Sequence, residues 1–426
     1  MHSLRMMVVL MAVGIALLVS STGSALAGAS TDSSGASTVN LTFIYNDLSI
    51  LATEHLAPSD GNVLGNVTDI VSYLNSEGGL GGHQIKLTSY KMPSLTGSAA
   101  SDHAACLAAT ENDHANIVLI GNAVDDTVAQ CVAVQHKTLT IVGDGPALSI
   151  FQQADGRLFA TGSNVAIDAQ RLARVTASIA ANGGYLKNKK VGVIVQGIPE
   201  DQSLVSGTLI PALTRLGHKP VAEATVPFPT GATTCSETAP AIQVMKQAGV
   251  QVIFLAAYDL CGVAVVTAAK QDDYQPQWIT NSDNTTDTVS QFFAPVKDNW
   301  NGALGINESF PASTAAAKCV QEALVPKGLN YAPSSDAYGI ATQTCIQLED
   351  IGTALGKVGT TFSNQSMISA LEAEKVQPTN GGPTGTWSAS QHDAGDWVSL
   401  YRYSASAGKM LPISTNTVQV PCPCAP

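Results

Sequence analysis

One short stretch decides the fold: Asn75-Ser76-Glu77-Gly78-Gly79-Leu80-Gly81-Gly82-His83-Gln84-Ile85. Apolar residues at helical spacing precede it, and a strand-like run follows it directly. We predict that a helix over residues 62–76 ends at Glu77, where the glycines supply the positive φ angles of a C-cap. A strand over residues 84–88 begins at once. This close succession of helix and strand indicates an α/β protein.

The same alternation continues on both sides of this stretch. Further strands are predicted at residues 41–45, 117–121, 138–142, 191–195, 221–226 and 252–256, and further helices at 99–110, 128–135, 167–181, 204–216 and 239–248. Strands that alternate with helices form parallel sheets with right-handed crossovers. The pattern breaks near residues 156–163, which indicates two similar α/β lobes, and it becomes irregular after Trp278.

Composition narrows the choice of function. The chain has 426 residues, 45% of them hydrophobic and only 13% charged, and its formal net charge is −12. The length fits two to three domains of about 150 residues. Binding to nucleic acid depends on lysine and arginine that neutralise phosphates, so the acidic balance argues against it, and equally against an anionic membrane surface.

The first residues indicate export. A short basic region ends at Arg5, an apolar run covers residues 6–19, and Ala25-Leu26-Ala27 fits a cleavage site. The run is shorter than the roughly 20 residues that a membrane span needs. A buried N-terminal helix is the alternative to a signal peptide. We expect a signal peptide over residues 1–27 and a flexible linker over residues 28–38. Because Ala29 stands where a lipoprotein needs cysteine, we expect a soluble periplasmic or extracellular protein without a lipid anchor.

All eight cysteines lie beyond this segment, at 106, 131, 235, 261, 319, 345, 422 and 424. An even number in an exported chain indicates disulfides, although the count alone allows 105 pairings. The spacings of 25, 26 and 26 residues each span one strand–helix unit, so we expect Cys106–Cys131, Cys235–Cys261 and Cys319–Cys345. A zinc site is the competing interpretation, but no C-x-x-C pair occurs. Cys422 and Cys424 are either bonded to each other or free.

The stretch at residues 75–85 resembles the N-x-x-G-G-I-x-G-x-x-I/V turn of type I periplasmic binding proteins, in the branch that binds leucine, isoleucine and valine. Ile120-Gly121 and the segment Gly382-Pro383-Thr384-Gly385-Thr386-Trp387 add to the resemblance, which covers nearly all of residues 39–403. It implies two Rossmann-like lobes joined by a three-segment hinge. The first lobe would take residues 39–160 and 290–384, the second 161–289 and 385–421, leaving 422–426 as a tail.

The resemblance also places a ligand between the lobes, where the parallel strands end. In the first lobe the candidates are Tyr45, Asn122, Asp125, Thr127, Asp144 and Gly145. Relatives use small hydroxyl residues and backbone N–H groups here to hold a ligand carboxylate, supported by a helix N-terminus. The acids in these loops are a departure from that pattern. Alternatively, Asp125 or Asp126 caps the following helix, and Asp144 stabilises a turn between two glycines.

In the second lobe the resemblance implies an aromatic residue and an acid that holds a ligand ammonium. Tyr258 and Asp283 match these roles, and Glu200 lies in the first of the three loops. We expect the neighbouring Asp201 to cap its helix. Trp278 and Trp300 fit the core as well as the cleft.

The implied function is that of an extracytoplasmic substrate-binding protein of an ABC importer. It would be a monomer without a cofactor, which carries a small polar ligand, such as an amino acid, an amide or a related amine, to a permease. The acidic loops favour an amine or amide group on the ligand and make a carboxylate optional. A ligand-sensing module for a receptor is the alternative. A secreted hydrolase is disfavoured because G-x-S-x-G, H-E-x-x-H and Walker motifs are absent from the sequence.

Overall fold

We describe the protein from a computed structural model, which covers residues 37–46, 61–92, 99–121, 124, 126–143, 145–161, 168–229, 234–257, 259–280, 284–285, 287–307, 314–333, 335–359, 362–376, 385–393, 397–413 and 418–419. Within these ranges the chain forms two large sheets, with helices packed against both, and one separate pair of short strands, an α/β fold. The fold class predicted from the sequence is therefore confirmed.

The first sheet is parallel, with the order β2-β1-β3-β4-β5. Its strands are β1 (Thr38–Asn46), β2 (Gln84–Met92), β3 (Ile117–Ile120), β4 (Leu139–Val142) and β5 (Leu158–Ala160). All residues of β3, β4 and β5 are buried, as expected for a parallel sheet covered on both faces. Because the strands are parallel, their carboxyl ends all lie at one edge of the sheet.

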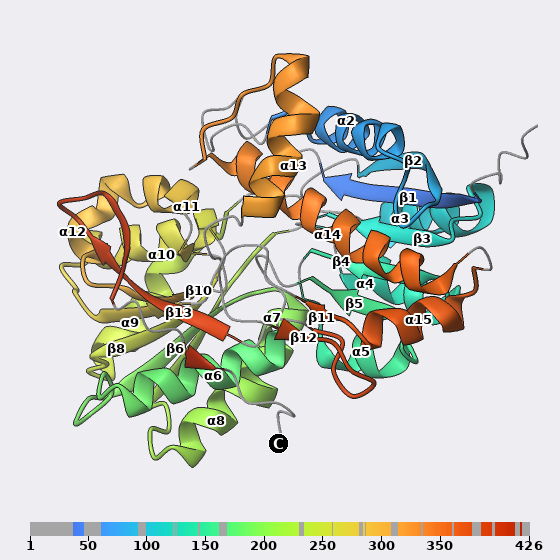
Figure 1. Ribbon diagram of the computed structural model, residues 1–426. Helices are drawn as coiled ribbons and strands as arrows, with labels where there is room; N and C mark the ends of the chain where they lie inside the picture. The colour runs from blue at the N-terminus through green and yellow to red at the C-terminus, as the bar shows by residue number, and fades with distance from the viewer. Residues whose placement is uncertain are drawn as a thin grey trace, which may run out of the picture. The chain divides into compact units, whose positions relative to one another are not determined.

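Helices from two distant parts of the chain cover this sheet. One group is local: α2 (Val63–Ser76), α3 (Ala99–Leu107), α4 (Asp126–Ala129) and α5 (Leu148–Gln153), with π-helical turns at Ala108–Asn112 and Gln130–Gln135. The other group comes much later: α13 (Thr314–Leu324), α14 (Asp336–Val358) and α15 (Asn364–Glu372), with a 3₁₀ turn at Val325–Lys327. Figure 1 shows α13 and α14 beside α2, and residues of α2, α13, α14 and α15 share one hydrophobic core with β1. We call this sheet and its helices the first lobe.

The second sheet has the order β14-β13-β10-β9-β8-β6-β7, and β15 pairs with β13. Five strands are parallel: β6 (Val191–Gln196), β7 (Ala222–Val226), β8 (Val252–Ala256), β9 (Gln277–Thr280) and β10 (Leu304–Asn307). Three antiparallel strands extend the sheet: β13 (Trp397–Ser404), β14 (Lys409–Pro412) and β15 (Val418–Gln419). A separate short pair joins β11 (Lys375–Val376) to β12 (Gly385–Thr386).

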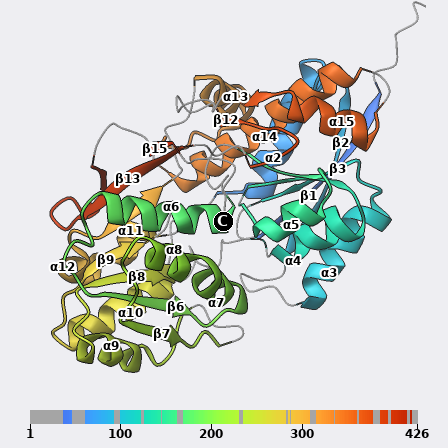
Figure 2. The ribbon, with the colours of Figure 1, turned by 90° about the horizontal axis from the view of Figure 1, so that it is seen from below.

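Two groups of helices cover the second sheet, one on each face (Figure 2). One face packs against α6 (Ala169–Asn182) and α8 (Ile210–Arg215), with α7 (Pro199–Leu204) and a π-helical turn at Val205–Leu209 between them. The other face packs against α9 (Thr238–Gln247) and α10 (Asp259–Gln271). Next to α10 lie α11 (Asp287–Phe292), a 3₁₀ turn at Ala294–Val296 and α12 (Lys297–Trp300). We call this sheet and its helices the second lobe.

The turn at residues 75–85 forms as predicted. Helix α2 ends with Glu77 as its C-cap, and Gly78, Gly79, Gly81 and Gly82 all have positive φ angles. Glycine is required at position 81 for a second reason: a Cβ there would lie 2.3 Å from a backbone nitrogen of α14. The turn therefore joins α2 to β2 and also packs against a helix from the distant segment.

The boundaries of the two lobes differ from the predicted ones at two places. Strand β10 pairs with β9, and Trp300 packs in the core of the second lobe, so the distant segment of the first lobe begins after Asn307 and not at residue 290. Trp387 packs in the core of the first lobe, so that segment extends beyond residue 384. The boundary at residue 290 was predicted wrongly because β10 is only four residues long and has no hydrophobic periodicity that marks it as a strand.

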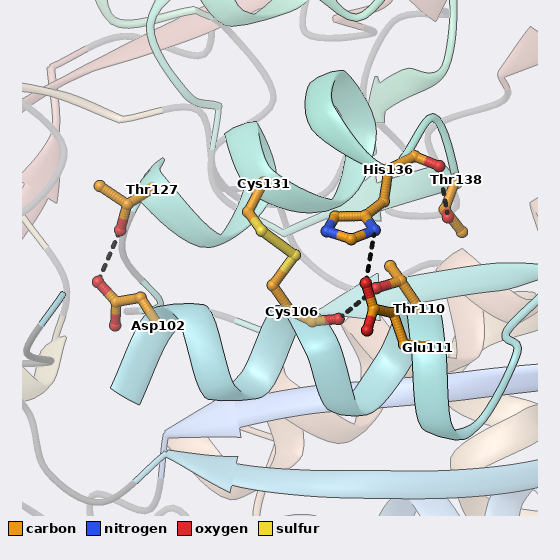
Figure 3. The surroundings of a disulfide bond; sticks show 8 residues. All are labelled: Asp102, Cys106, Thr110, Glu111, Thr127, Cys131, His136 and Thr138. Atoms are coloured by element: carbon orange, nitrogen blue, oxygen red, sulfur yellow. Dashed lines mark hydrogen bonds and ion pairs between the residues drawn. A yellow bond between two sulfur atoms is a disulfide. The ribbon is translucent and has the colours of Figure 1, made fainter. Parts of the chain in front are cut away.

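The three expected disulfides, Cys106–Cys131, Cys235–Cys261 and Cys319–Cys345, are all present. Figure 3 shows the first, which joins α3 to the π-helical turn after α4. Each bond lies within one lobe. Cys422 and Cys424 lie outside the described residues.

Candidate functional site

The carboxyl ends of the strands position the candidate site. In the first lobe, hydrogen bonds continue the sheet past the strand ends: Gly121 donates its N–H to the carbonyl of Ile44, and Gly143 to that of Ile120. The loops that follow β1, β3 and β4 therefore start side by side. Of the residues predicted here, Tyr45, Thr127 and Gly145 are described, whereas Asn122, Asp125 and Asp144 lie outside the described residues.

Tyr45 lies at the end of β1. Its ring stacks on Phe43 with 5.2 Å between the centroids, and the residue is 7% exposed within the core of the first lobe. The ring therefore has a packing role.

Asp126 and Thr127 begin helix α4. The hydroxyl of Thr127 donates a 2.6 Å hydrogen bond to Asp102 on α3 (Figure 3). Asp126 accepts a 3.0 Å hydrogen bond from the backbone N–H of Ala147, which is the N-cap of α5. The carboxylate of Asp126 thus holds the start of the next helix. Asp125, the other residue predicted to cap α4, lies outside the described residues.

The charge environment of Asp126 connects the two lobes. Burial raises the pKa of this carboxyl above its ordinary value, the hydrogen bond from Ala147 opposes the shift, and the negative charge of Glu200 adds to it. Glu200 is exposed in the first turn of α7, which follows β6 in the second lobe. The charge of a carboxylate in the second lobe therefore adds to the upward shift of the pKa of Asp126 in the first lobe.

A second polar contact joins the lobes beside α5. The backbone N–H of Leu148, the first residue of α5, donates a 2.8 Å hydrogen bond to the side-chain carbonyl of Gln170 on α6. Gly145 lies three residues earlier and is partly buried. Reasoning from the sequence missed Gln170, because a helix residue that reaches another lobe has no local signature.

In the second lobe, β6 ends at the buried Gln196, and α7 begins at Pro199. Ile198 occupies the N-cap of α7 and makes no side-chain cap hydrogen bond. The prediction that Asp201 caps this helix is therefore wrong. Asp201 lies within the first turn and is buried, where the helix dipole favours a carboxylate.

Asn284 organises the ends of β8 and β9. It is fully buried, and its side-chain amide donates hydrogen bonds to the carbonyl of Ala257 at 2.7 Å and to the hydroxyl of Thr280 at 2.9 Å. The predicted ligand residues Tyr258 and Asp283 adjoin these positions but lie outside the described residues. Trp278 and Trp300 are both buried in the core, with ring centroids 6.0 Å apart, so neither is a cleft residue.

Among the described residues, Cys106, Cys131 and His136 alone have the spacing of a metal site, with ligand atoms within 4.8 Å of one another. Both sulfurs belong to one disulfide (Figure 3), whereas a metal requires thiolates. The group is therefore a disulfide with a neighbouring histidine. We also find, in the described ranges, no helix with the length and apolar character that a membrane crossing requires.

A model of the family described as periplasmic binding protein matches residues 57–409. No curated protein matches the chain. Among solved structures, a solute-binding protein of an ABC transporter from R. palustris in complex with 4-hydroxybenzoate is 16% identical, with a TM-score of 0.67 over 90% of this chain and 98% of that one. A branched-chain amino acid ABC transporter protein from Thermus thermophilus with bound valine is 14% identical, with a TM-score of 0.68 over 90% and 97%. A leucine-binding protein from Thermotoga maritima is 13% identical, with a TM-score of 0.63 over 89% and 99%.

Proposed function

The chain belongs to the periplasmic binding protein family, of the type I fold, and we propose from this that it captures a small polar ligand between its two lobes and delivers it to the permease of an ABC importer. Proteins of this family are solute-binding components of transporters and not enzymes. We infer that the chain is exported and acts as a monomer. Its three disulfides support an oxidising compartment.

The observation that carries this proposal is the interaction of Asp126 with Glu200. Asp126 follows β3 of the first sheet and Glu200 follows β6 of the second, and the charge of Glu200 adds to the rise in the pKa of Asp126 that burial causes. In open parallel sheets, ligands bind outside the carboxyl ends of the strands. A carboxylate of the second lobe whose charge adds to the raised pKa of a carboxylate in the first lobe supports a site that the two lobes share.

The proposed ligand carries an amine or amide group. Asp126 and Glu200 contribute negative charge, and the loops with Asp125, Asp144 and Asp283 add more. Carboxylates enclosed together raise one another's pKa unless a cation or a hydrogen-bond donor satisfies them. The structural relatives above were solved with valine and with 4-hydroxybenzoate, both of which carry a carboxylate. Here a carboxylate is optional, and backbone N–H groups near Gly145 would be its donors.

The residues that we propose for ligand contact are those of the strand-end loops: Asn122, Asp125, Thr127, Asp144 and Gly145 in the first lobe, and Glu200, Tyr258 and Asp283 in the second. Thr127 already donates its proton to Asp102, so its oxygen can still accept a hydrogen bond from a ligand amine. The hydroxyl of Tyr45 is a further candidate, although its ring is part of the core.

Mass spectrometry of the small molecules released when the purified protein is denatured tests this proposal. We expect one compound with an amine or amide group in stoichiometric amount, and this compound should raise the melting temperature of ligand-free protein. An Asp155→Asn variant is the control, because Asp155 is exposed on the first lobe and pairs only with Arg157 nearby among its described contacts. Release of no compound, together with no thermal shift from any amino acid, amide or amine, would contradict the proposal.

A further inference from the structure

One carboxylate oxygen receives two hydrogen bonds from the start of α6. Oδ2 of Asp393 accepts from Nη1 of Arg171 at 2.9 Å and from the backbone N–H of Asp168 at 3.0 Å. Asp168 is the N-cap of α6 and accepts the N–H of Arg171 at 2.8 Å. Asp393 is 6% exposed and Arg171 is 1% exposed. The three residues therefore form a buried polar network.

Asp393 belongs to a segment that packs against the first lobe. The residue before it, His392, accepts the N–H of Ala160 at 2.9 Å and stacks its ring on Phe159, with 4.1 Å between the centroids. Trp387, earlier in the same segment, donates its indole N–H to the carbonyl of Ala160 at 3.0 Å. Residues 387–393 are thus attached to the end of β5.

Helix α6, in contrast, is held by the second lobe. Ala177 and Ala180 pack against strands β6 and β8, and Leu172 and Val175 pack against Ile306 and Val398. The contacts of Asp393 with Asp168 and Arg171 therefore bridge the two lobes.

This bridge lies where the chain passes between the lobes. One passage runs from the end of β5 to Asp168, and another runs from Asp393 to β13. In a hinge motion, a few residues at such passages take up the rotation while the packed lobes move as bodies. A contact at the axis of rotation changes least, so it can persist in both the open and the closed arrangement.

We propose that the Arg171–Asp393 pair, positioned by Asp168, is the pivot that keeps the two passages together and makes the opening of the lobes a rotation about this point. The inference rests on the proposed function, because the pivot matters only to a protein whose lobes open and close. Arg171, Asp168 and Asp393 are positioning residues in this account. Removing one member of a buried ion pair is strongly destabilising, and Asp393 holds both of its contacts with α6 on one oxygen.

The test is hydrogen exchange of the ligand-free protein at pH 7.5, in the wild type and in Asp393→Asn. The control is Glu374→Gln, which removes another buried carboxylate, paired with Lys357 at 3.3 Å inside the first lobe. In Asp393→Asn we expect exchange at residues 157–161, 168–172 and 387–393 to rise by more than about tenfold, because local opening there is no longer opposed. Small-angle scattering should show a wider range of overall molecular dimensions in Asp393→Asn than in the wild type. The control should alter exchange near residue 374 alone.

An equal rise over both lobes, a rise that Glu374→Gln reproduces at the passages, or no rise there would overturn the proposal. If Asp393→Asn does not fold, Asp393→Glu replaces it: this variant keeps the charge but displaces it by one methylene, and a smaller rise confined to the same residues is expected. No change at those residues would again contradict the pivot. Ligand does not enter the measurement, so a failure of the proposed transport function leaves this result interpretable.

Discussion

The side-chain amide of Asn284 donates a 2.7 Å hydrogen bond to the backbone carbonyl of Ala257, at the carboxyl end of β8. A second bond from the same amide reaches the hydroxyl of Thr280, the last residue of β9. One fully buried side chain thus fixes the ends of two neighbouring strands. The residues that we assign to the ligand in the second lobe, Tyr258 and Asp283, adjoin these ends in the sequence.

Replacing Asn284 with alanine should destabilise the protein and weaken ligand binding. The carbonyl of Ala257 would lose its partner inside the protein, at a cost of about 1–3 kcal/mol. Urea denaturation measures the loss of stability, and calorimetry the loss of affinity. Asn182→Ala is the control, because that exposed amide bonds only to Ser178 one turn away among its described contacts, and a change within about 0.5 kcal/mol is expected. Equal effects of the two substitutions would contradict the role of Asn284.

Removing the Cys319–Cys345 disulfide by a double substitution to alanine should cost about 3–4 kcal/mol. This bond closes a loop of 26 residues between α13 and α14, and the expected cost follows from the chain entropy that the loop restores to the unfolded state. Thermal denaturation measures the loss, and peptide mapping without reductant reports all pairings, including the state of Cys422 and Cys424. A map with bonds between the lobes would show that the assigned pairing is wrong.

Stability should fall as pH rises from about 5 to 8. Burial raises the pKa of Glu374 from 4.5 to about 7, although Lys357 opposes the shift. The folded protein therefore binds more protons than the unfolded chain in this range. The stability that Glu374 contributes is full below its unfolded pKa and is lost as pH rises through its folded pKa of about 7. The pKa of Asp393, raised by burial to about 6, acts in the same direction.

Urea denaturation at several pH values measures this dependence. The slope of the free energy of unfolding against pH should become smaller in Glu374→Gln. It should stay unchanged in the control Glu223→Gln, which alters an exposed carboxylate on β7. A slope that Glu374→Gln leaves intact would show that this group does not bind the extra proton.

Ligand should make the protein more compact and more stable. If two lobes close on a small molecule, small-angle scattering should show a smaller radius of gyration at saturation. Stability should rise by about 2.7 kcal/mol when the ligand is at a hundred times its Kd. Binding of a verified ligand without any compaction would show that closure of the lobes is not part of the mechanism.

The parts of the fold that the sequence predicts well are those with local causes. The glycines after α2 permit the positive φ angles of the turn, and the buried strand at residues 117–120 is a short apolar run, so both can be predicted from the local sequence. The spacing of the cysteines predicts the three disulfides because each bond closes a short loop of 25 or 26 residues within one lobe. Strand β10 was missed because its membership of the second sheet depends on pairing with β9 and β13.

The candidate site was harder to predict, because its contacts join distant residues. Asp126 bonds to Ala147, 21 residues away, and Leu148 to Gln170, 22 residues away in the other lobe. An aspartate at a helix start has a local interpretation as a cap, and the sequence offers no sign that its partner is another helix. Asn284 could have been suspected from its place just after a strand, beside the predicted Asp283.

The most direct test of the central claim is a calorimetric panel of branched-chain amino acids, amides, urea, polyamines and aromatic acids. It should be run on the wild type, on Asp144→Asn and on Asp283→Asn, with Asp155→Asn as the control. We predict tight binding of a ligand with an amine or amide group, weakened at least tenfold by one of the two site substitutions and unchanged in the control. Tight binding of a purely anionic ligand that neither substitution affects would contradict the account, because the acidic loops would then be structural.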